Sequence, residues 1–485
     1  MAVIFQTTDD TDGIIVNNSD ELVIMPGVNV TDPSGTGVLL SSGASITRVY
    51  NYGHIISSSA AVDANSSSII ENHGTITSIN SEAIDLAGED TTHVIRNFGT
   101  ITTNAYMIDT LSLGGESDIT LFNSGDMIQN QGTTSTFNYN DSSLGDVTIV
   151  NSGTIFSNTI NMGRLGEGYL YNTGEITSTY IAGSSSALGL TVVNHGTITD
   201  RDANSIIQGS SVNDLVVNSG IITGAINLWI GDDFYSTIGD GVTAGTIYGE
   251  AGNDTLVGGE FADELDGGAD DDQLVGRGGD DVLDGGSGDD FILGGEGNDG
   301  INGGSNNDTL NANAGDDSVY GEGGNDVLVG QDGSDLLDGG DNDDIMDGGN
   351  GDDTLEGGSG NDILRGRAGE DDLAGGLGRD YLTGGEGADN FVFRALAGTV
   401  AGANRDQIMD FEQGVDLIVV AGMSPGVFEF RGTAAFAPSG NPEIRLNETA
   451  TGSTIVQFDA DGNGTIDAEI RVGGVTGLTA DDFVL

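Results

Sequence analysis

The chain has 485 residues, with 77 acidic and 13 basic side chains and a formal net charge of −64. Such a charge repels nucleic acid and anionic membranes, so we expect cations to be the partners of this protein and nucleic acid to be excluded. The chain contains no cysteine, which excludes disulfides, thiol catalysis and thiolate metal sites.

The N-terminal residues, MAVIFQTTDDTDG, contain no basic region and only a short apolar run. We therefore expect no Sec-type signal peptide, and an export signal would have to lie elsewhere in the chain. No run of about 18 apolar residues is present, so no transmembrane segment is expected.

Residues 1–230 repeat the phrase N-x-G-x-I at spacings of 21 to 28 residues. The residue two positions after each glycine is isoleucine seven times and Met127 once. A fixed phrase with a variable spacing indicates strand–turn–strand coils with loops of variable length. The pattern predicts an inward ladder of isoleucines, a hydrogen-bonded ladder of asparagines, and a glycine in each turn. The asparagines are Asn51, Asn72, Asn97, Asn123, Asn151, Asn172, Asn194 and Asn218.

Phrases such as IENHGTI and IVNSGTI resemble the repeats of bacterial autotransporter passengers and related surface adhesins. This resemblance implies a right-handed parallel β-helix over residues 1–230. It also implies an adhesive, matrix or surface-layer role, with cell-surface or matrix polysaccharide as a possible partner.

Catalytic motifs are missing from the sequence, and we assign no catalytic residue. The four histidines do not form HExxH, and neither GxSxG nor GxxxxGK[ST] occurs. An alternative is a polysaccharide lyase or epimerase, which needs a base in a groove, often with arginine. The candidate arginines are Arg48, Arg96, Arg164 and Arg201. The TIT phrases occur in only three of eight coils, too few for a flat ice-binding threonine array.

A nine-residue period runs without insertion through sixteen units from Gly249 to Phe393. Position 6 is always Asp, position 8 is always apolar, and position 1 is Gly in all units except one, which has Ala312. Position 4 is Gly, Asn or Asp except at Phe261, which predicts a positive φ there. Two units should close one coil, so that turns 18 residues apart stack and position 8 fills the core.

Stacked aspartates would repel each other strongly without a counter-ion. The sixteen units contain 38 acidic residues against four arginines. A hard divalent cation held by carboxylates and turn carbonyls removes this conflict, and calcium suits oxygen ligands in flexible geometry.

Phrases such as GGSGNDILR and GGNGDDTLE resemble the RTX calcium-binding repeat, GGxGxDxUx, which forms a parallel β-roll. The resemblance implies that each position-6 aspartate binds calcium, with on the order of 14 ions in all. Residues 231–248 keep Ile238 and Ile247 in register without the aspartate, and we interpret them as a degenerate cap. The implied metal ligands are Asp254, Asp263, Asp272, Asp281, Asp290, Asp299, Asp308, Asp317, Asp326, Asp335, Asp344, Asp353, Asp362, Asp371, Asp380 and Asp389.

Residues 394–485 resemble the C-terminal domain of serralysin-type and other RTX proteins, which implies a type I secretion signal and a type I exporter as partner. The final TADDFVL looks like that signal, or like a last strand docked on a β domain. Asp459–Asp467 imitates an EF-hand loop, but Ile470 occupies the place of the bidentate glutamate. Strand-like flanks favour a β-hairpin with an acidic turn.

The sequence thus predicts an all-β protein with a parallel β-helix (1–230), a calcium-binding β-roll (231–393) and a small C-terminal β domain (394–485). We expect an extracellular protein that folds on calcium outside the cell, because binding free energy becomes folding free energy.

Overall fold

The computed structural model describes residues 3–485 except 18–19, 42–45, 115–116, 131–136, 139–143, 163–165, 184–187, 203–204, 395–400, 403 and 424–425. The chain divides into two compact units, Met1–Gly259 and Glu260–Leu485. Over the described ranges the regular structure consists of strands and one 3-10 helix, η2 (Ala480–Asp482), which confirms the all-β class. The division into three domains remains a prediction. None of these residues forms a helix long and apolar enough to cross a membrane.

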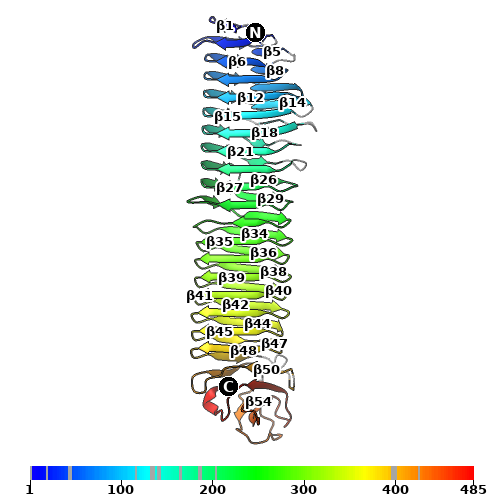
Figure 1. Ribbon diagram of the computed structural model, residues 1–485, viewed down its shortest axis with the longest axis vertical. Coiled ribbons are helices and arrows are strands. Elements are labelled where there is room, and N and C mark those ends of the chain that lie inside the picture. The colour runs from blue at the N-terminus through cyan, green and yellow to red at the C-terminus, as the bar shows by residue number, and fades with distance from the viewer. Residues whose placement is uncertain are drawn as a thin grey trace. The chain divides into compact units, whose positions relative to one another are not determined.

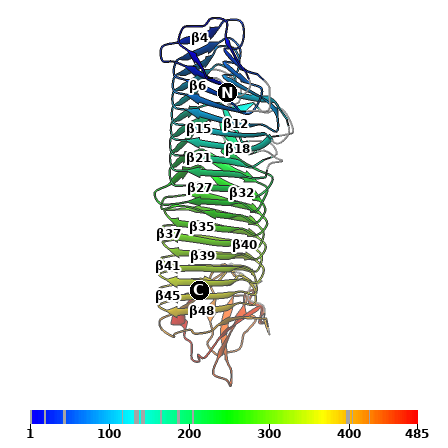
Figure 2. The same cartoon turned by 45° about the horizontal axis from the view of Figure 1, so that its top comes forward.

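The first unit is a parallel β-solenoid whose coils have three faces (Figures 1 and 2). The β6 sheet contains β1 (Val3–Gln6), β3 (Glu21–Ile24), β6 (Thr47–Asn51), β9 (Ser68–Asn72), β12 (Thr92–Asn97), β15 (Ser117–Asn123), β18 (Leu144–Asn151), β21 (Gly168–Asn172), β24 (Leu190–Asn194), β27 (Leu215–Asn218), β30 (Phe234–Thr237) and β33 (Thr255–Val257). The β7 sheet contains β4 (Asn29–Asp32), β7 (His54–Ser57), β10 (Thr75–Ser78), β13 (Thr100–Thr103), β16 (Asp126–Gln129), β19 (Thr154–Phe156), β22 (Glu175–Ser178), β25 (Thr197–Asp200), β28 (Ile221–Thr223) and β31 (Val242–Ala244).

The third face has two successive sets of parallel strands. The first set is β2 (Ile14–Val16), β5 (Val38–Leu40), β8 (Val62–Ala64), β11 (Ile84–Glu89), β14 (Ile108–Gly114) and β17 (Phe137–Asn138). The second set is β20 (Thr159–Asn161), β23 (Tyr180–Ala182), β26 (Ser205–Ser210), β29 (Ala225–Trp229) and β32 (Ile247–Ala251).

The predicted isoleucine ladder fills the core of the first unit. Strand pairing places Ile76 between Ile55 and Ile101 in register, and side chains alternate between the core and the surface along each strand. The ladder residues, each at most 1% exposed, are Ile55, Ile76, Ile101, Met127, Ile155, Ile176, Ile198 and Ile222.

The predicted asparagine ladder is also confirmed. Each Nδ2 donates to Oδ1 of the asparagine one coil later, at 2.8 to 2.9 Å, from Asn51 through to Asn218. The glycines lie in the turns as expected, but they do not have positive φ. They are needed because the coils approach closely: a Cβ on Gly99 would overlap the carbonyl oxygen of Gly74.

The second unit contains a two-sided parallel β-roll. The β34 sheet consists of β34 (Glu264–Ala269), β36 (Val282–Ser287), β38 (Gly300–Ser305), β40 (Ser318–Gly323), β42 (Leu336–Asp341), β44 (Thr354–Gly360), β46 (Asp372–Ala374), β47 (Leu377–Gly378), β49 (Asn390–Phe393), β51 (Leu417–Val420) and β56 (Phe483–Val484). The β35 sheet begins with β35 (Gln273–Gly278), β37 (Phe291–Glu296), β39 (Thr309–Ala314), β41 (Val327–Asp332), β43 (Ile345–Asn350), β45 (Ile363–Ala368), β48 (Tyr381–Glu386) and β50 (Asp406–Ile408).

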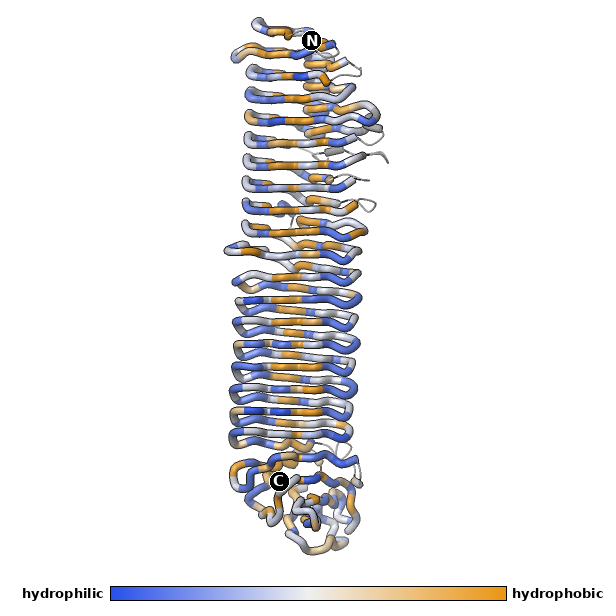
Figure 3. Tube along the Cα trace, in the orientation of Figure 1, coloured by the Kyte–Doolittle hydropathy of each residue, from blue (hydrophilic) through white to orange (hydrophobic). Residues whose placement is uncertain are grey.

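Coils of the roll repeat every 18 residues, as predicted, and Leu274 pairs with Ile292. All position-8 side chains are buried at 0 to 1% exposure, and Figure 3 shows apolar residues recurring in each coil. Most strands of the roll are six residues long rather than three. They extend from position 7 through position 3 of the next unit, because the residues at positions 2 and 3, such as Gly286 and Ser287, also pair across coils.

A positive φ occurs at position 4 in fourteen of the sixteen units, the exceptions being Phe261 and Gly360. Gly360 differs because β44 continues through it, so its backbone is extended. Position 2 also has a positive φ in every unit except the one with Gly259, a requirement that the nine-residue pattern does not predict. Six non-glycine residues occupy this position: Glu250, Arg277, Asn313, Glu322, Gln331 and Arg367.

The interpretation of residues 231–248 as a cap without the aspartate is wrong. Ile238 is 40% exposed, and Tyr235 is the fully buried core residue of this turn. Tyr235 follows Asp233 by two residues, as the position-8 residue follows the position-6 aspartate in the roll. The N–H of Asp233 donates to Asp254 Oδ1, which is the bond that links successive turns in the roll. These two aspartates are therefore equivalent, and the coil between them is 21 residues long instead of 18. Counting back in nines from Gly249 therefore misses Asp233.

The end of the second unit adds β52 (Glu429–Phe430), β53 (Glu443–Glu448), β54 (Thr454–Asp459) and β55 (Ala468–Val472) to the β35 sheet. The predicted β-hairpin around Asp459–Asp467 is confirmed, since β54 and β55 pair in antiparallel fashion. The C-terminal strand β56 docks in parallel on β51, so the alternative interpretation of TADDFVL as a last docked strand is confirmed.

Candidate metal centre

The position-6 aspartates form two stacks along the turns of the roll. Oδ1 of Asp281 accepts the backbone N–H of Asp263, 18 residues earlier, at 2.7 Å. The same bond recurs at every following unit as far as Asp389, with lengths of 2.7 to 3.1 Å. Each turn is thereby fixed to the one stacked before it.

The second carboxylate oxygen of these aspartates is buried without a hydrogen-bond donor. Buried polar atoms in folded proteins nearly always have a partner, so a row of such oxygens indicates a missing ligand. The thirteen aspartates with this feature are Asp281, Asp290, Asp299, Asp308, Asp317, Asp326, Asp335, Asp344, Asp353, Asp362, Asp371, Asp380 and Asp389. The remaining predicted ligands, Asp254, Asp263 and Asp272, are buried at the same place in their turns.

Twelve of these thirteen unpaired oxygens lie beside the position-1 glycine of their own turn, and the turn of Asp317 has Ala312 at that position. A Cβ on Gly276 would overlap Asp281 Oδ2 and would lie 2.7 Å from the carbonyl oxygen of Gly294 in the next coil. Carboxylate and carbonyl oxygens therefore converge where the glycine leaves space. This is the donor set that calcium takes, so the residues fit the ion that the sequence implies.

Burial and neighbouring carboxylates raise the pKa of the stacked aspartates. Burial is the larger cause for Asp281, and Asp299 and Asp263 add repulsion, which together raise its pKa to about 7. The pKa of Asp308 and that of Asp344 are also raised to about 7, mainly by burial. When bound, a divalent cation supplies positive charge between these carboxylates and removes the repulsion.

A second ladder, at position 5, was not anticipated. Oδ1 of Asp280 accepts the backbone N–H of Asn298 at 2.9 Å, and equivalent bonds link the turns from Asp271 to Glu370. It runs opposite to the position-6 ladder, because here the later coil donates to the earlier side chain. The frequent Asn or Asp before the position-6 aspartate was the sequence signal for it.

Three carboxylates meet in the hairpin turn of the second unit. One oxygen each of Asp459, Asp461 and Asp467 lies within 4.8 Å of the others. Asp459 already accepts the backbone N–H groups of Asn463 and Gly464. Ile470 is fully buried in β55 and does not serve as a ligand.

The histidines of the first unit occupy structural positions. His73 stacks between Tyr52 and Phe98, with ring centroids 4.7 and 4.6 Å away. His93 is fully buried and contacts Ser68 Oγ and Thr91 Oγ1 at 2.9 and 3.0 Å. Burial lowers the pKa of His93 to about 4, so this histidine is neutral and helps to pack a polar corner.

The candidate arginines are dispersed. Arg48 lies 3.6 Å from Glu21, and Arg96 lies over the ring of Phe122. Arg201 covers the ring of Phe156 and donates to the carbonyl of Ser157 at 3.1 Å. Arg164 lies outside the described residues.

A column of carboxylates crosses the third face of the first unit. Asp85 pairs in register with Asp63 on one side and Asp109 on the other. Burial, followed by repulsion from Asp63 and Asp109, raises the pKa of Asp85 to about 7.

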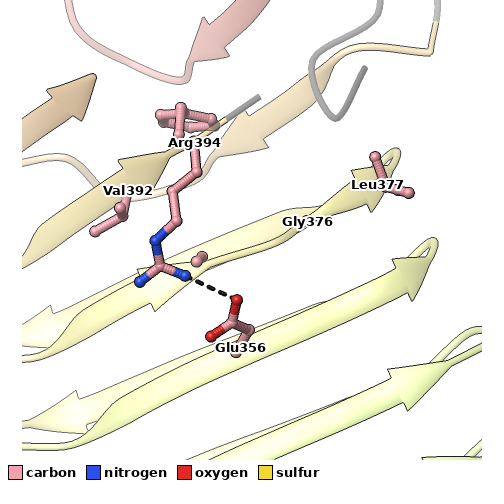
Figure 4. Close-up of a pocket in the computed structure, with 7 residues that line it drawn as sticks. Glu356, Gly376, Leu377, Val392 and Arg394 are labelled. Atoms are coloured by element: carbon pink, nitrogen blue, oxygen red, sulfur yellow. Dashed lines mark hydrogen bonds and ion pairs between the residues drawn. The ribbon is translucent and has the colours of Figure 1, made fainter. Parts of the chain in front are cut away.

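A small cavity of about 160 Å³ lies in the roll where β46 and β47 interrupt one strand (Figure 4). Ala374, Gly376, Leu377, Val392 and Phe393 make most of its lining apolar. Arg394 and Glu356 form an ion pair of 2.8 Å at its edge. The cavity is too small for a polysaccharide chain, and the arginine is already neutralised.

Comparisons with known proteins agree with the geometry of the turns. Residues 248–391 match, in overlapping segments, the family model described as RTX calcium-binding nonapeptide repeat (4 copies). A solution structure of the AlgE6R3 subunit of the Azotobacter vinelandii mannuronan C5-epimerase is 31% identical, with 30% of this chain and 78% of that chain covered and a TM-score of 0.25. The AlgE6R2 subunit of the same enzyme is 25% identical, with 38% and 91% covered and a TM-score of 0.20. A comparison with curated proteins gave no match. Residues 248–391 therefore consist of RTX calcium-binding nonapeptide repeats.

Proposed function

We propose that this is a secreted protein whose roll folds when calcium fills the stacked turns outside the cell. The observation that carries the proposal is the row of buried aspartate oxygens without donors. Where free calcium is low, the acidic register repels itself and the chain stays unfolded, which suits passage through a type I exporter. Where calcium is near millimolar, loops of modest affinity fill, and the binding free energy becomes folding free energy.

The test is the circular dichroism of the purified full chain in chelator, in calcium and in magnesium. We expect the β-sheet signal of the roll to appear only with calcium, since magnesium demands a more rigid octahedral site. Equal β-sheet content in chelator would contradict calcium-coupled folding. Export is tested separately by deleting Thr479–Leu485, which should retain the chain inside cells that carry a type I exporter.

For the role outside the cell, we propose adhesion to polysaccharide or matrix through the outer surface of the β6 sheet. Large side chains are exposed along this sheet, among them Phe122, Tyr169, Leu215 and Phe234. Leu215 and Phe234 lie side by side on adjacent coils. Exposed aromatic rings on a flat sheet suit stacking on sugar rings, and a glycan array with Tyr169→Ala and Phe234→Ala variants tests this role.

The alternative, a polysaccharide lyase or epimerase, is favoured by one observation. Asp85 has a pKa of about 7 and lies between Asp63 and Asp109 on consecutive coils, as a general base could. Assays on acidic polysaccharides with wild type and Asp85→Asn separate the two functions: turnover that Asp85→Asn abolishes supports the enzyme, and binding without turnover supports the adhesin.

A further inference from the structure

The coil that precedes the nine-residue register repeats the hydrogen bonds and backbone of a calcium-binding turn, with the buried Leu228 at place 1 instead of glycine. In Leu228–Ser236, Asp233 takes place 6 and Tyr235 takes place 8, and both are buried. Asp233 Oδ1 accepts the N–H of Asp214 at 2.6 Å, and the N–H of Asp233 donates to Asp254 Oδ1 at 2.7 Å. This is the bond that links Asp263 to Asp281 in the roll.

The backbone of this turn also follows the repeat. Place 2 is Trp229 with φ 78° and place 4 is Gly231 with φ 146°, compared with 78° at Arg277 and 144° at Gly288 in the roll. The position-5 ladder is present as well, since the N–H of Asn253 donates to Asp232 Oδ1 at 3.1 Å. A tryptophan tolerates this φ poorly, so the turn must be held by its neighbours.

An independent observation points to a ligand at this turn. Asp233 is 2% exposed, and its Oδ2 is buried without a hydrogen-bond donor, as in the thirteen aspartates of the roll. The next coil supplies the Gly249–Val257 turn, whose Asp254 is 1% exposed. Two buried carboxylates on consecutive turns repel each other, and a divalent cation between them would remove that repulsion.

The turn one coil earlier contains Asp214, and neither carboxylate oxygen of Asp214 lacks a hydrogen-bond donor. Asp214 Oδ2 accepts the N–H of Ser210 at 2.5 Å, while Oδ1 accepts the N–H of Leu190 at 2.5 Å and the hydroxyl of Ser210 at 2.9 Å. Protein donors satisfy both oxygens, so Asp214 closes the stack without a metal.

We propose that a calcium ion binds between the Leu228–Ser236 and Gly249–Val257 turns, with Asp233 Oδ2 as a ligand. Asp233 and its own turn lie in the first unit, upstream of the residues that match the repeat family, and the 21-residue spacing to Asp254 hides Asp233 from a nine-residue pattern. The site makes the closing coils of the first solenoid dependent on calcium. This inference rests on the proposed calcium binding by the position-6 aspartates.

Trp229 makes the site directly observable, because it is the only tryptophan of the chain and belongs to the same turn. Terbium replaces calcium at oxygen sites, and it emits when a nearby excited tryptophan transfers energy to it. The full-length protein is titrated with terbium under excitation at the red edge of tryptophan absorption, and we expect sensitised emission that excess calcium abolishes.

Asp233→Asn is compared with Asp232→Asn, a matched neutralisation of the adjacent exposed aspartate. We expect Asp233→Asn to weaken terbium binding at the tryptophan-sensitised site about tenfold or more, because a carboxylate ligand is lost. Asp232→Asn should keep the wild-type titration, and both variants should keep the calcium-dependent circular dichroism of the roll.

Three results overturn the inference. One is a wild-type chain whose roll responds to calcium while tryptophan sensitises no terbium. Another is an Asp233→Asn chain with unchanged sensitised emission. The third is an equal loss in both variants, which would reflect charge alone. A chain that binds no calcium anywhere would instead contradict the proposed function, and this inference with it.

Discussion

Asp308 Oδ1 accepts the backbone N–H of Asp290 at 2.8 Å, while Asp308 Oδ2 is buried without a donor. One oxygen of the carboxylate therefore serves the stacking of the coils, and the other is left for a ligand. Because the same division recurs along both stacks, structure and metal binding depend on the same side chain. An asparagine there would keep Oδ1 as an acceptor but remove the charge.

Asp308→Asn should thus have opposite effects with and without calcium. In chelator, the variant should be at least as structured as wild type, because a buried repulsive charge is gone. In saturating calcium, it should gain less stability than wild type, by about 1 to 3 kcal/mol, because a charged ligand is lost. Circular dichroism in chelator and chemical unfolding in saturating calcium measure these two effects, with the exposed Asp289→Asn as control. A variant as stable as wild type in saturating calcium would contradict a ligand role.

The stability of the calcium-free roll should depend on pH. The pKa of Asp308 is about 7 in the folded state and 3.8 ordinarily, so the folded form binds protons more tightly than the unfolded form. The stabilisation from the more tightly bound proton on Asp308 is fully present below about pH 3.8 and is lost as the pH rises through about 7. In chelator, circular dichroism should show more β structure at pH 5 than at pH 8. The calcium concentration for half-saturation should rise as the pH falls below 7, and a pH-independent value would contradict the raised pKa.

The sequence allowed the roll to be predicted well, because a strict period lets one unit predict the surroundings of the next. Position 8 repeats every nine residues, so Leu274 and Ile292 could be placed side by side in the core without coordinates. The asparagine ladder followed from the same logic despite its variable spacing. The exposed side chains on the outer surfaces follow no such repeat, so the sequence did not allow a binding or catalytic role to be assigned to any of them.

Two features were not predicted from the sequence, because backbone geometry determines them and residue type does not. A positive φ at position 2 is hidden where Arg277 or Glu322 occupies it. Asp233 was missed because a coil of 21 residues breaks the count, while hydrogen bonding keeps the turn in its stack. The sequence signal for this turn was Asp233 followed two residues later by Tyr235, which is the spacing of positions 6 and 8 in the roll.

The asparagine ladder should be a main source of stability in the first unit. Asn123 accepts from Asn97 and donates to Asn151, both at 2.8 Å, and it is 2% exposed. Asn123→Leu removes the side-chain acceptor of Asn97 Nδ2 and the donor to Asn151 Oδ1, and should cost about 2 to 4 kcal/mol of unfolding free energy. Urea unfolding of the full chain, followed by the fluorescence of Trp229, measures this. Ser124→Ala, at the exposed adjacent position, should change stability by less than about 0.5 kcal/mol.

The positive φ at position 2 should be detectable as strain at Gln331. This residue has φ 84°, and its Nε2 donates to the side chains of Asn311 and Asn313. Gln331→Ala and Gln331→Gly lose these bonds alike but differ in their tolerance of the backbone. We expect the glycine variant to be more stable than the alanine variant by about 1 kcal/mol in saturating calcium, measured by thermal unfolding. At Gly323, where φ is ordinary and a Cβ has open space, the order should reverse, because alanine restricts the unfolded chain. If alanine is favoured at both positions, the backbone of position 2 is not strained.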